Sequence, residues 1–507
     1  MYGVRLLRLL HVGHRWLGVG LGAMVLLWFV SGVVMLFVAR PQLTETERLQ
    51  ASPRLELTAV AQPPLAAWQA LGRPGWPEAV RLNTVAGRPV YHFLADDQWS
   101  SVEAVSGTPR AVVSADEAKA AALAFVKAGR TVSAQVAEIT RDQWTVSGRY
   151  NALRPFYRVE LDDPAQHDIY VSQRTGEIAL DTDFGERAWN WVGTVIHWLY
   201  FTPLREQGVL WRNVVLWSSA AALLLALGGI WLGWQRLHLK KRYPEGRITP
   251  YRAGWKRWHH LLGLGGGLFL LTWLLSGWLS LAPFGWAKGN ATSPLERKNL
   301  AGGELDAGVL GRAPLLRVPQ PVVEIKWMRF HGKPYLLLKN AEGKSWLSPP
   351  DQGAPQEFLA LTEIIAAGQS VLPQATLRGA NWLSEGDSNY FAHRHRPLTL
   401  PVVRLHFDDP ENTLLYIDPA SGQLLRRIDD AARLHRWLFG ALHRLDFPSL
   451  DGSGPARETL VIGLSLCAGG LAWSGCMLGW RRIRRRGAPA NQSGFQTDHA
   501  IKVRRSS

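Results

Sequence analysis

Cysteine is scarce in this chain, and charged residues are few. Only two cysteines occur among 507 residues, Cys467 and Cys476, and both lie in one apolar run. Nine residues of helix would separate them by about 13 Å, which is too far for a disulfide. Two such cysteines exclude thiolate-ligated iron–sulfur clusters and c-type haem attachment. Charged residues make up 19% of the chain and Trp occurs 24 times, which is typical of membrane proteins with aromatic belts.

Acidic residues are nearly missing from the three segments that carry the positive charge. Residues 1–16, 235–258 and 481–507 together hold 19 basic and only two acidic residues, so they account for the net charge of +16. The rest of the chain is nearly neutral. Because these segments flank apolar runs, the positive-inside rule explains the charge, and nucleic-acid binding is not expected.

Four uncharged runs are long enough to cross a bilayer. The first run follows three arginines but exceeds the apolar core of a signal peptide, so we expect a retained anchor. Charge bias predicts a bacterial inner-membrane protein with both ends and the 237–257 loop in the cytoplasm. The four runs are Trp16–Val38, Asn213–Trp234, Leu261–Phe284 and Thr459–Trp480.

The sequence repeats itself at an offset of 245 or 246 residues. Residues 14–32, HRWLGVGLGAMVLLWFVSG, match residues 259–277, HHLLGLGGGLFLLTWLLSG. Residues 161–177 match residues 407–423 in the same way. Repeats of the same orientation predict a pseudo-twofold axis along the membrane normal.

The two long segments between the runs are predicted to be α+β modules. In the first module, Ala115–Lys127 has helical spacing, and the alternating runs FYRVEL and HDIYVSQ flank a D-D-P turn before EIALD. VVRLHF and TLLYID repeat the pattern in the second module.

The predicted fold class is therefore an α-helical membrane protein with four transmembrane helices, an internal duplication and two α+β periplasmic modules. The expected parts of the first half are a cytoplasmic N-terminus with the first membrane helix (1–40), the first module (41–185), an amphipathic helix with the second membrane helix (186–236) and a basic loop (237–257). Those of the second half are the third membrane helix (258–284), the second module (285–430), an amphipathic helix with the fourth membrane helix (431–481) and a basic tail (482–507).

Four histidines match across the repeat as two pairs. His14 pairs with His259 at the predicted cytoplasmic ends of two membrane helices, and His197 pairs with His443 in the predicted outer helices. Two imidazoles that face each other across an axis suit the ligation of one haem iron. The alternatives are a histidine in the headgroup layer and glycine rows that only pack helices. Weaker candidates are His11, His260, His435, His238 and the run His393-Arg394-His395-Arg396, which could bind an acidic ligand or form a solvated strand end.

The order of these motifs resembles a known family. A helix and a Y-x-V…D-D-P…I-Y-V…T-G-E-I hairpin lie between an H-R-W-x-G-x-x-x-G helix and a helix that ends in G-x-W-x-G-W. This pattern, present in both halves, resembles the PepSY-associated transmembrane family. The resemblance implies an inner-membrane ferric-siderophore reductase that binds one or two haem b groups, with iron ligands among the paired histidines.

Two functions of different classes follow. The first is an oxidoreductase that passes electrons to a ferric siderophore or other ferric chelate at the periplasmic face. The chain has no P-loop, G-x-S-x-G or H-E-x-x-H motif, and its cytoplasmic segments are too short for a nucleotide domain, so a quinol or a cytoplasmic reductase must donate the electrons. The second is a non-redox anchor in the membrane lipid whose modules bind a peptide, protease or envelope partner.

Overall fold

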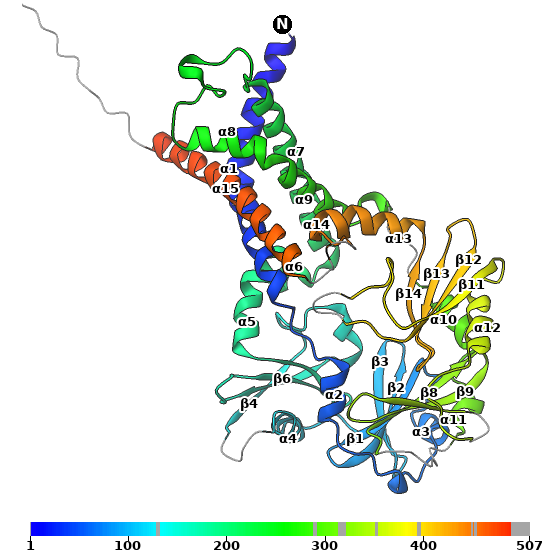
Figure 1. Ribbon diagram of the computed structural model, residues 1–507. Helices are drawn as coiled ribbons and strands as arrows, with labels where there is room; N and C mark the ends of the chain where they lie inside the picture. The colour runs from blue at the N-terminus through cyan, green and yellow to red at the C-terminus, as the bar shows by residue number, and fades with distance from the viewer. Residues whose placement is uncertain are drawn as a thin grey trace, which may run out of the picture. The chain divides into compact units, whose positions relative to one another are not determined.

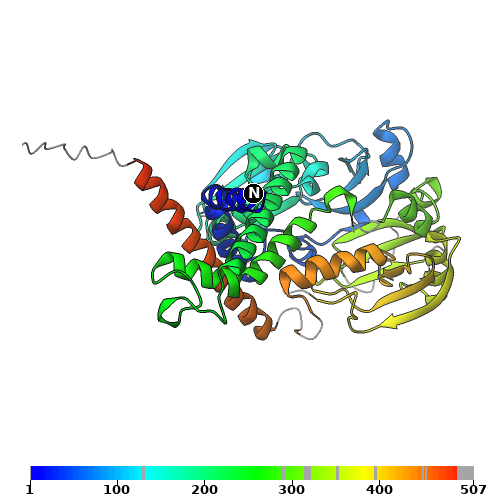
Figure 2. The same ribbon diagram turned by 90° about the horizontal axis from the view of Figure 1, so that it is seen from above.

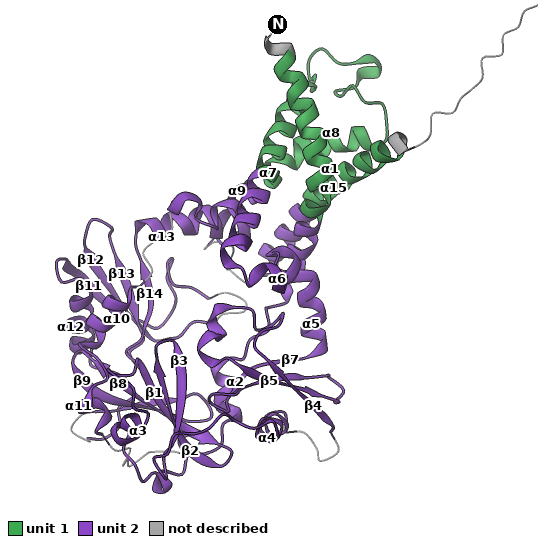
Figure 3. Ribbon diagram, turned by 180° about the vertical axis from the view of Figure 1, so that it is seen from behind, with its two compact units in different colours: residues 1–26, 221–271, 466–507 green, residues 27–220, 272–465 purple. Residues whose placement is uncertain are grey.

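The computed structural model divides the chain into two compact units. Unit 1 holds residues 1–26, 221–271 and 466–507, and unit 2 holds residues 27–220 and 272–465, shown in green and purple in Figure 3. Both units combine segments from the first and the second half of the sequence. The structure describes residues 2–127, 132–286, 292–312, 321–349, 353–392, 397–447, 450 and 454–487.

Three helices in the described part of the chain are long and apolar enough to cross a membrane (Figure 1). Each of these helices contains one of the apolar runs expected from the sequence, except that Val38, the last residue of the first run, lies just beyond its helix. The chain is therefore a membrane protein by the length and composition of its helices. The three are α1 (Tyr2–Phe37), α7 (Gly208–Gln235) and α15 (Pro455–Gly487).

The third expected run differs from the prediction. It forms two helices, α8 (Trp255–Gly265) and α9 (Gly267–Leu279), which are bent by 63° at their break. Gly263, Gly265, Gly266 and Gly267 gather there, and glycine has a low helix propensity, so the break falls at the weakest point of the helix. The pair counts as a fourth span only if both helices cross together.

Glycines allow the helices of unit 1 to approach one another closely. A Cβ added at Gly22 of α1 would lie 3.3 Å from Sγ of Cys476 on α15, and one added at Gly479 would lie 3.4 Å from Val19. The first contact is tighter than ordinary van der Waals packing, and the second is at its lower limit. Small residues at these positions therefore hold α1 against α15, as is usual for helices in lipid.

The main sheet of unit 2 has six antiparallel strands in the order β10-β9-β8-β1-β2-β3. Its centre is the pair β1–β8, in which Arg81 lies opposite Lys326, and the strands on the two sides come from the two halves of the sequence. The sequence analysis missed this sheet, because β2 and β9 are buried on both faces and lack a clear polar–apolar alternation. The strands are β1 (Ala79–Val85), β2 (Arg88–Ala95), β3 (Gln98–Glu103), β8 (Glu324–Phe330), β9 (Lys333–Lys339) and β10 (Ser345–Ser348).

Two four-stranded antiparallel sheets complete unit 2, in the orders β4-β5-β6-β7 and β11-β12-β13-β14. Helix α4 (Ala115–Phe125) packs Ala118 and Ala122 on the first, and α12 (Leu361–Val371) packs Ile364 and Ala367 on the second. The predicted α+β modules are confirmed. Their strands are β4 (Ala134–Ile139), β5 (Phe156–Leu161), β6 (Asp168–Ser172), β7 (Ile178–Thr182), β11 (Thr376–Leu383), β12 (Val402–Asp408), β13 (Leu414–Ile417) and β14 (Leu424–Ile428).

Short helices connect these sheets to the long helices. Helices lie at both predicted amphipathic segments, and each contains a stretch of π-helix; the orange run that begins at α13 is plain in Figure 2. The short helices are α2 (Glu45–Ala51), α3 (Pro64–Ala70), α5 (Phe184–Asn190), α6 (Thr202–Arg205), α10 (Pro294–Ala301), α11 (Ala307–Leu310), α13 (Asp430–His435) and α14 (Leu442–Arg444), and the π-helical stretches are Trp191–Val195 and Arg436–Ala441.

A buried polar cluster lies where β1–β3 meet the first four-stranded sheet. His92 is fully buried, with Nδ1 2.9 Å from Ser101 Oγ and Nε2 2.9 Å from Asn83 Oδ1. Asn83 donates to Glu177 at 2.6 Å, and Arg81 forms an ion pair with the same carboxylate. Burial lowers the pKa of His92 to about 4. Burial alone would raise the pKa of Glu177, but Arg81 and the other positive groups outweigh it and hold the value at about 2.

Candidate functional site

His197 and His443 each follow a π-helical stretch in unit 2. In the first half, Asp183 caps α5 by accepting from the backbone N–H of Glu186, and the helix then widens at Trp191–Val195 before His197. In the second half, Asp429 caps α13, and Arg436–Ala441 widens before His443. π-Helical turns are rare and recur at functional sites, so two at corresponding positions draw attention to the histidines that follow.

One nitrogen of His197 is held by helix α1. Its Nδ1 lies 3.1 Å from the carbonyl oxygen of Trp28 and 3.1 Å from Oγ of Ser31. Because a carbonyl can only accept, Nδ1 carries the ring proton and donates it. The neutral ring then has its lone pair on Nε2, which no described residue hydrogen-bonds, so His197 is oriented as a metal-ligating histidine would be.

His443 repeats this arrangement with residues of α9. Its Nδ1 lies 3.3 Å from the carbonyl oxygen of Trp273 and 3.1 Å from Oγ of Ser276. These partners follow Trp28 and Ser31 in the sequence by 245 residues. A Cβ added at Gly32 or at Gly277 would lie 3.3 Å from Cε1 of the neighbouring histidine. The two histidines therefore have matching supports.

The rings of His197 and His443 lie with their centroids 6.1 Å apart and their planes inclined at 68°. A metal–imidazole bond is about 2 Å long and the ring centre lies about 1 Å further, so two rings on opposite sides of one ion have centres about 6 Å apart. Burial lowers the pKa of His197 to about 4. Burial, followed by the charge of His197, lowers the pKa of His443 to about 3. Both imidazoles are neutral at pH 7, as ligands must be.

His14 and His259 form an equivalent pair in unit 1, again with ring centroids 6.1 Å apart. Nδ1 of His14 donates to the carbonyl of Leu225 at 3.0 Å, and Nδ1 of His259 lies 3.0 Å from Oγ of Ser474. Ser474 donates its own proton to a backbone carbonyl, so its oxygen accepts from the ring. In this pair, too, the Nε2 atoms have no hydrogen-bond partner among the described residues.

Glycines of α7 and α15 make room for this pair. A Cβ added at Gly229 would lie 2.6 Å from Cε1 of His14, and one added at Gly475 would lie 3.3 Å from Cε1 of His259. Gly228, next in the chain, has open space around it. In the glycine rows of the matching helices, at 18, 20 and 22 and at 263, 265 and 267, an added Cβ would meet no histidine. The sequence repeat contained the signal for Gly229 and Gly475, because they are 246 residues apart.

The weaker histidine candidates have other partners. His11 bonds through both nitrogens, to the Leu7 carbonyl at 2.8 Å and to Arg236 at 2.8 Å. His260 uses Nε2 for the carbonyl of Gly233 at 2.9 Å. His238 stacks on Tyr243, with centroids 4.5 Å apart, and His435 lies 5.7 Å from the ring of Phe439. The run His393-Arg394-His395-Arg396 lies outside the described residues.

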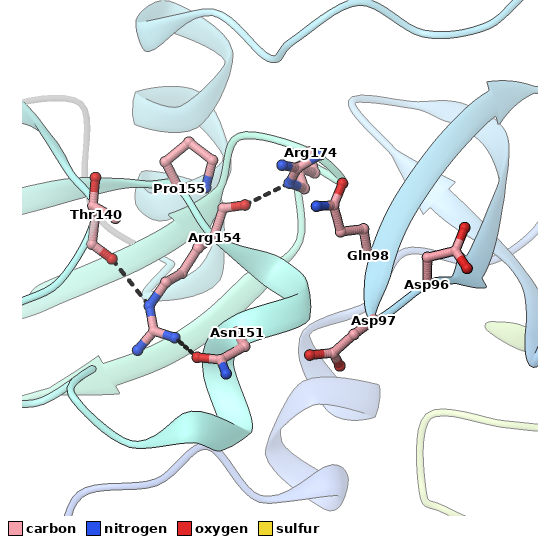
Figure 4. Close-up of a pocket in the computed structure, with 8 residues that line it drawn as sticks. All are labelled: Asp96, Asp97, Gln98, Thr140, Asn151, Arg154, Pro155 and Arg174. Carbon is pink, nitrogen blue, oxygen red and sulfur yellow. Dashed lines mark hydrogen bonds between the residues drawn. The ribbon is translucent and has the colours of Figure 1, made fainter. Parts of the chain in front are cut away.

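Unit 2 also has a polar hollow of about 400 Å³ beside the first α+β module (Figure 4). One wall carries Asp96 and Asp97 of the β2–β3 turn with Gln98, the first residue of β3, and Arg154 and Arg174 belong to the other. Figure 4 shows Arg154 turned toward Thr140 and Asn151, where it donates to the carbonyl of Thr140 at 3.1 Å. Arg174 donates through Nε to the carbonyl of Arg154 at 2.5 Å.

Comparison with known proteins places the chain among membrane proteins. The sequence profile of the PepSY-associated TM region matches residues 13–309, which is more than half of the chain. The match includes His14, His197 and His259. No curated protein sequence matches the chain.

Proposed function

We propose that this chain, which belongs to the family defined by the PepSY-associated TM region, is a haem b membrane reductase that delivers electrons to a ferric chelate. The observation that carries the proposal is the pair of histidine sites. Each has two rings with centroids 6.1 Å apart and Nδ1 atoms hydrogen-bonded to the protein. Two imidazoles held at this spacing could ligate the iron of one haem.

The residues around both sites suit such a group. Haem b would supply a reversible one-electron couple between ferric and ferrous iron. His14 and His259 would hold one haem, and His197 and His443 a second. Ser31, with the carbonyl of Trp28, fixes the tautomer and the ring plane of one ligand, which tunes how strongly its Nε2 donates. Described residues form no cluster of three or more metal-ligating side chains, so the macrocycle would complete the coordination.

We further infer four spans in a bacterial inner membrane, with the bent pair α8–α9 as the third, and an ancestral duplication. The basic segments support cytoplasmic placement of the first histidine pair, and the second pair would then lie near the periplasmic modules. Electrons from a quinol or a cytoplasmic reductase would enter at the first pair. A ferric siderophore or another ferric chelate would accept them near the second pair, and reduction would weaken its hold on iron.

The cofactor is tested on the purified full-length protein by its absorption spectrum and by low-spin ferric EPR. We expect a Soret band, with two haems per chain in the wild type. His14→Ala and His259→Ala should each remove one haem, and His197→Ala and His443→Ala the other. His435→Ala is the matched control and should keep both haems. A colourless wild-type protein, or full haem content in all four variants, would exclude this assignment.

The direction of electron flow is tested with the same variants. Pre-reduced His14→Ala protein retains the second site, so an added ferric siderophore should oxidise it and bleach the ferrous band. The same variant should not turn over with a donor added on the cytoplasmic side of a vesicle. If no ferric chelate oxidises the ferrous protein, the haems serve another acceptor and the reductase proposal is wrong.

The hollow in Figure 4 favours a second candidate, a non-redox protein that binds a peptide or an envelope partner. Its volume of about 400 Å³ falls in the range of small-molecule sites. Carboxylates on one wall and Arg174 on the other could receive the two ends of a short peptide. This function requires no haem, so a colourless purified protein whose peptide binding is lost in Arg174→Ala would support it.

A further inference from the structure

The helical run before α15 carries two arginines that the first half of the chain lacks. Arg436 and Arg444 follow Asn190 and Trp198 by 246 residues, and they flank His443 as those two flank His197. Asn190 is fully hydrogen-bonded: its amide donates to two backbone carbonyls at 2.9 and 3.0 Å, and its oxygen accepts from a neighbouring threonine. The first half therefore needs no additional ligand at this position.

Arg436 is not satisfied in this way. Its Nε and Nη2 atoms are buried and have no hydrogen-bond partner among the described residues. The guanidinium lies 4.7 Å from the ring centre of Phe391 and 5.3 Å from that of Trp437. Ring faces attract the charge but do not accept hydrogen bonds from both N–H groups. A buried charged donor without an acceptor is costly, so an acceptor is expected beside it.

Arg444 extends the positive field toward His443. Its charge lies 5.5 Å from the ring centre of Phe439, which stacks on His443 with centroids 5.2 Å apart. Arg444 pairs with Asp446 at 3.2 Å, and Arg457 donates to its carbonyl. The side chains of Arg436 and Arg444 both reach Gly440, where an added Cβ would lie 3.6 Å from Cγ of Arg436 and 3.5 Å from Nη2 of Arg444. Positive charge is thus in excess around this histidine.

We infer that Arg436 and Arg444 bind a carboxylate group beside His443. A guanidinium presents paired N–H donors that match the two oxygens of a carboxylate, and such charge-assisted bonds are the strong ones. The carboxylate has two sources that share this chemistry: a propionate of the haem on the second histidine pair, or a carboxylate arm of the ferric chelate. The inference rests on the proposed function. It means that the carboxylate is bound on the side of His443 and not on the side of His197.

The test uses full-length protein with Arg436→Gln and Arg444→Gln. Arg433→Gln is the matched control, because Arg433 lies on the same helical run and forms an ion pair with Asp430 at 2.7 Å. The readouts are haem content, the midpoint potential of the second site, and KM for two probes. The probes are ferric citrate, which has carboxylates, and a neutral ferric tris-hydroxamate, which has none.

The two possible sources of the carboxylate predict different results for the arginine variants. If the chelate supplies the carboxylate, KM for ferric citrate should rise about tenfold or more in both variants, while KM for the hydroxamate stays unchanged. If the haem supplies it, both KM values stay unchanged and the midpoint potential shifts downward in both variants. Both variants should also retain haem b less tightly than the wild type, whereas haem dimethyl ester, whose propionates carry no charge, should bind all three proteins alike.

The inference is wrong if both variants match Arg433→Gln in midpoint potential and in both KM values. Failure of the proposed function would look different, because wild-type protein would then lack a Soret band before any variant is compared. A variant that fails to fold is recognised by the loss of both haems, since these arginines surround only the second pair. The other arginine variant then provides the measurement.

Discussion

The two halves of the chain use matching residues around their histidines but different residues in the sheet that they share. Both pairs have ring centroids 6.1 Å apart, and the supports of His197 and His443 agree within 0.2 Å. In the sheet, His92 of the first half stands where the second half has Leu337. A sheet core can be polar or apolar as long as its polar groups are hydrogen-bonded and its volume is filled. Two imidazoles that are to ligate one ion tolerate little displacement.

The largest expected effect comes from a substitution that makes the two halves alike at Glu324. Its counterpart 245 residues earlier is Ala79, so Glu324→Ala copies the first half. The Glu324 side chain is fully buried and pairs with Arg48 at 2.7 Å and Lys326 at 3.2 Å. Removing the buried carboxylate leaves Arg48 and Lys326 with the half-exposed Glu45 as their ion-pair partner, so we expect a loss of about 3 kcal/mol in unfolding free energy, the lower end for a broken buried pair. Pulse proteolysis of the purified protein measures it.

Glu45→Ala is the matched control for this substitution. Glu45 pairs with the same Lys326, but its side chain is 52% exposed, so water screens the interaction. The expected loss is below about 1 kcal/mol. Equal losses in the two variants would show that the buried charge network does not stabilise the sheet.

The second comparison concerns how stability depends on pH when His92 is replaced by leucine, the residue that the second half has at Leu337. The pKa of His92 falls from 6.5 to about 4 on folding, so the unfolded chain binds more protons between these values. The contribution of the neutral His92 to the unfolding free energy is fully present above pH 6.5, and about 3 kcal/mol of it should be lost as the pH falls to 4. Below pH 4.5 the depressed pKa of Glu177 adds to the loss. His92→Leu should be less stable at pH 7.5, and its stability should fall less steeply between pH 6.5 and 4.5, where His197 and His443 still contribute. An unchanged slope would assign the effect elsewhere.

The third comparison concerns the glycines that face the first histidine pair. An alanine at Gly229 would place its Cβ 2.6 Å from His14, whereas Gly228 has open space. Overpacking of this kind costs about 1–3 kcal/mol, so Gly229→Ala should weaken haem retention at the first site and Gly228→Ala should not. Gly475→Ala should fall between them, because its Cβ would be 3.3 Å from His259. Equal haem content in all three variants would show that the glycines only pack helices.

Much of the fold follows from the sequence because the relevant signals are local. Apolar runs give the long helices, and alternation with turn residues gives strands such as β5 and β6. The break in the third run was missed although its glycines are local, because an apolar run alone does not show where a helix bends. The central pair β1–β8 was missed because it joins distant segments of the chain. Gly266 is helical in φ and ψ yet ends a helix, and β9 reads as a plain apolar run.

The candidate site follows from the sequence only as far as the repeat extends. Comparing the halves pairs His14 with His259 and His197 with His443, and the structure brings each pair together. It cannot show which nitrogen each ring leaves free, since that depends on carbonyls such as that of Trp28. Nor can it show that two nitrogens of Arg436 are buried without an acceptor among the described residues, since the spacing of residues carries no information on hydrogen bonds.

The smallest expected effect comes from the hydroxyls that support the second histidine pair. Ser31→Ala and Ser276→Ala each remove one oxygen 3.1 Å from a histidine Nδ1, but the carbonyl of Trp28 or Trp273 still accepts the proton. The cost should be about 1 kcal/mol or less at each site, and the tautomer should persist. Both variants should therefore keep their haem and show small, similar shifts in midpoint potential by spectroelectrochemistry. Ser218→Ala, which removes a hydroxyl bonded only within α7, should show none. If one serine variant shifts the potential far more than the other, the matching hydrogen bonds do not have matching roles, and the asymmetry extends to the ligands themselves.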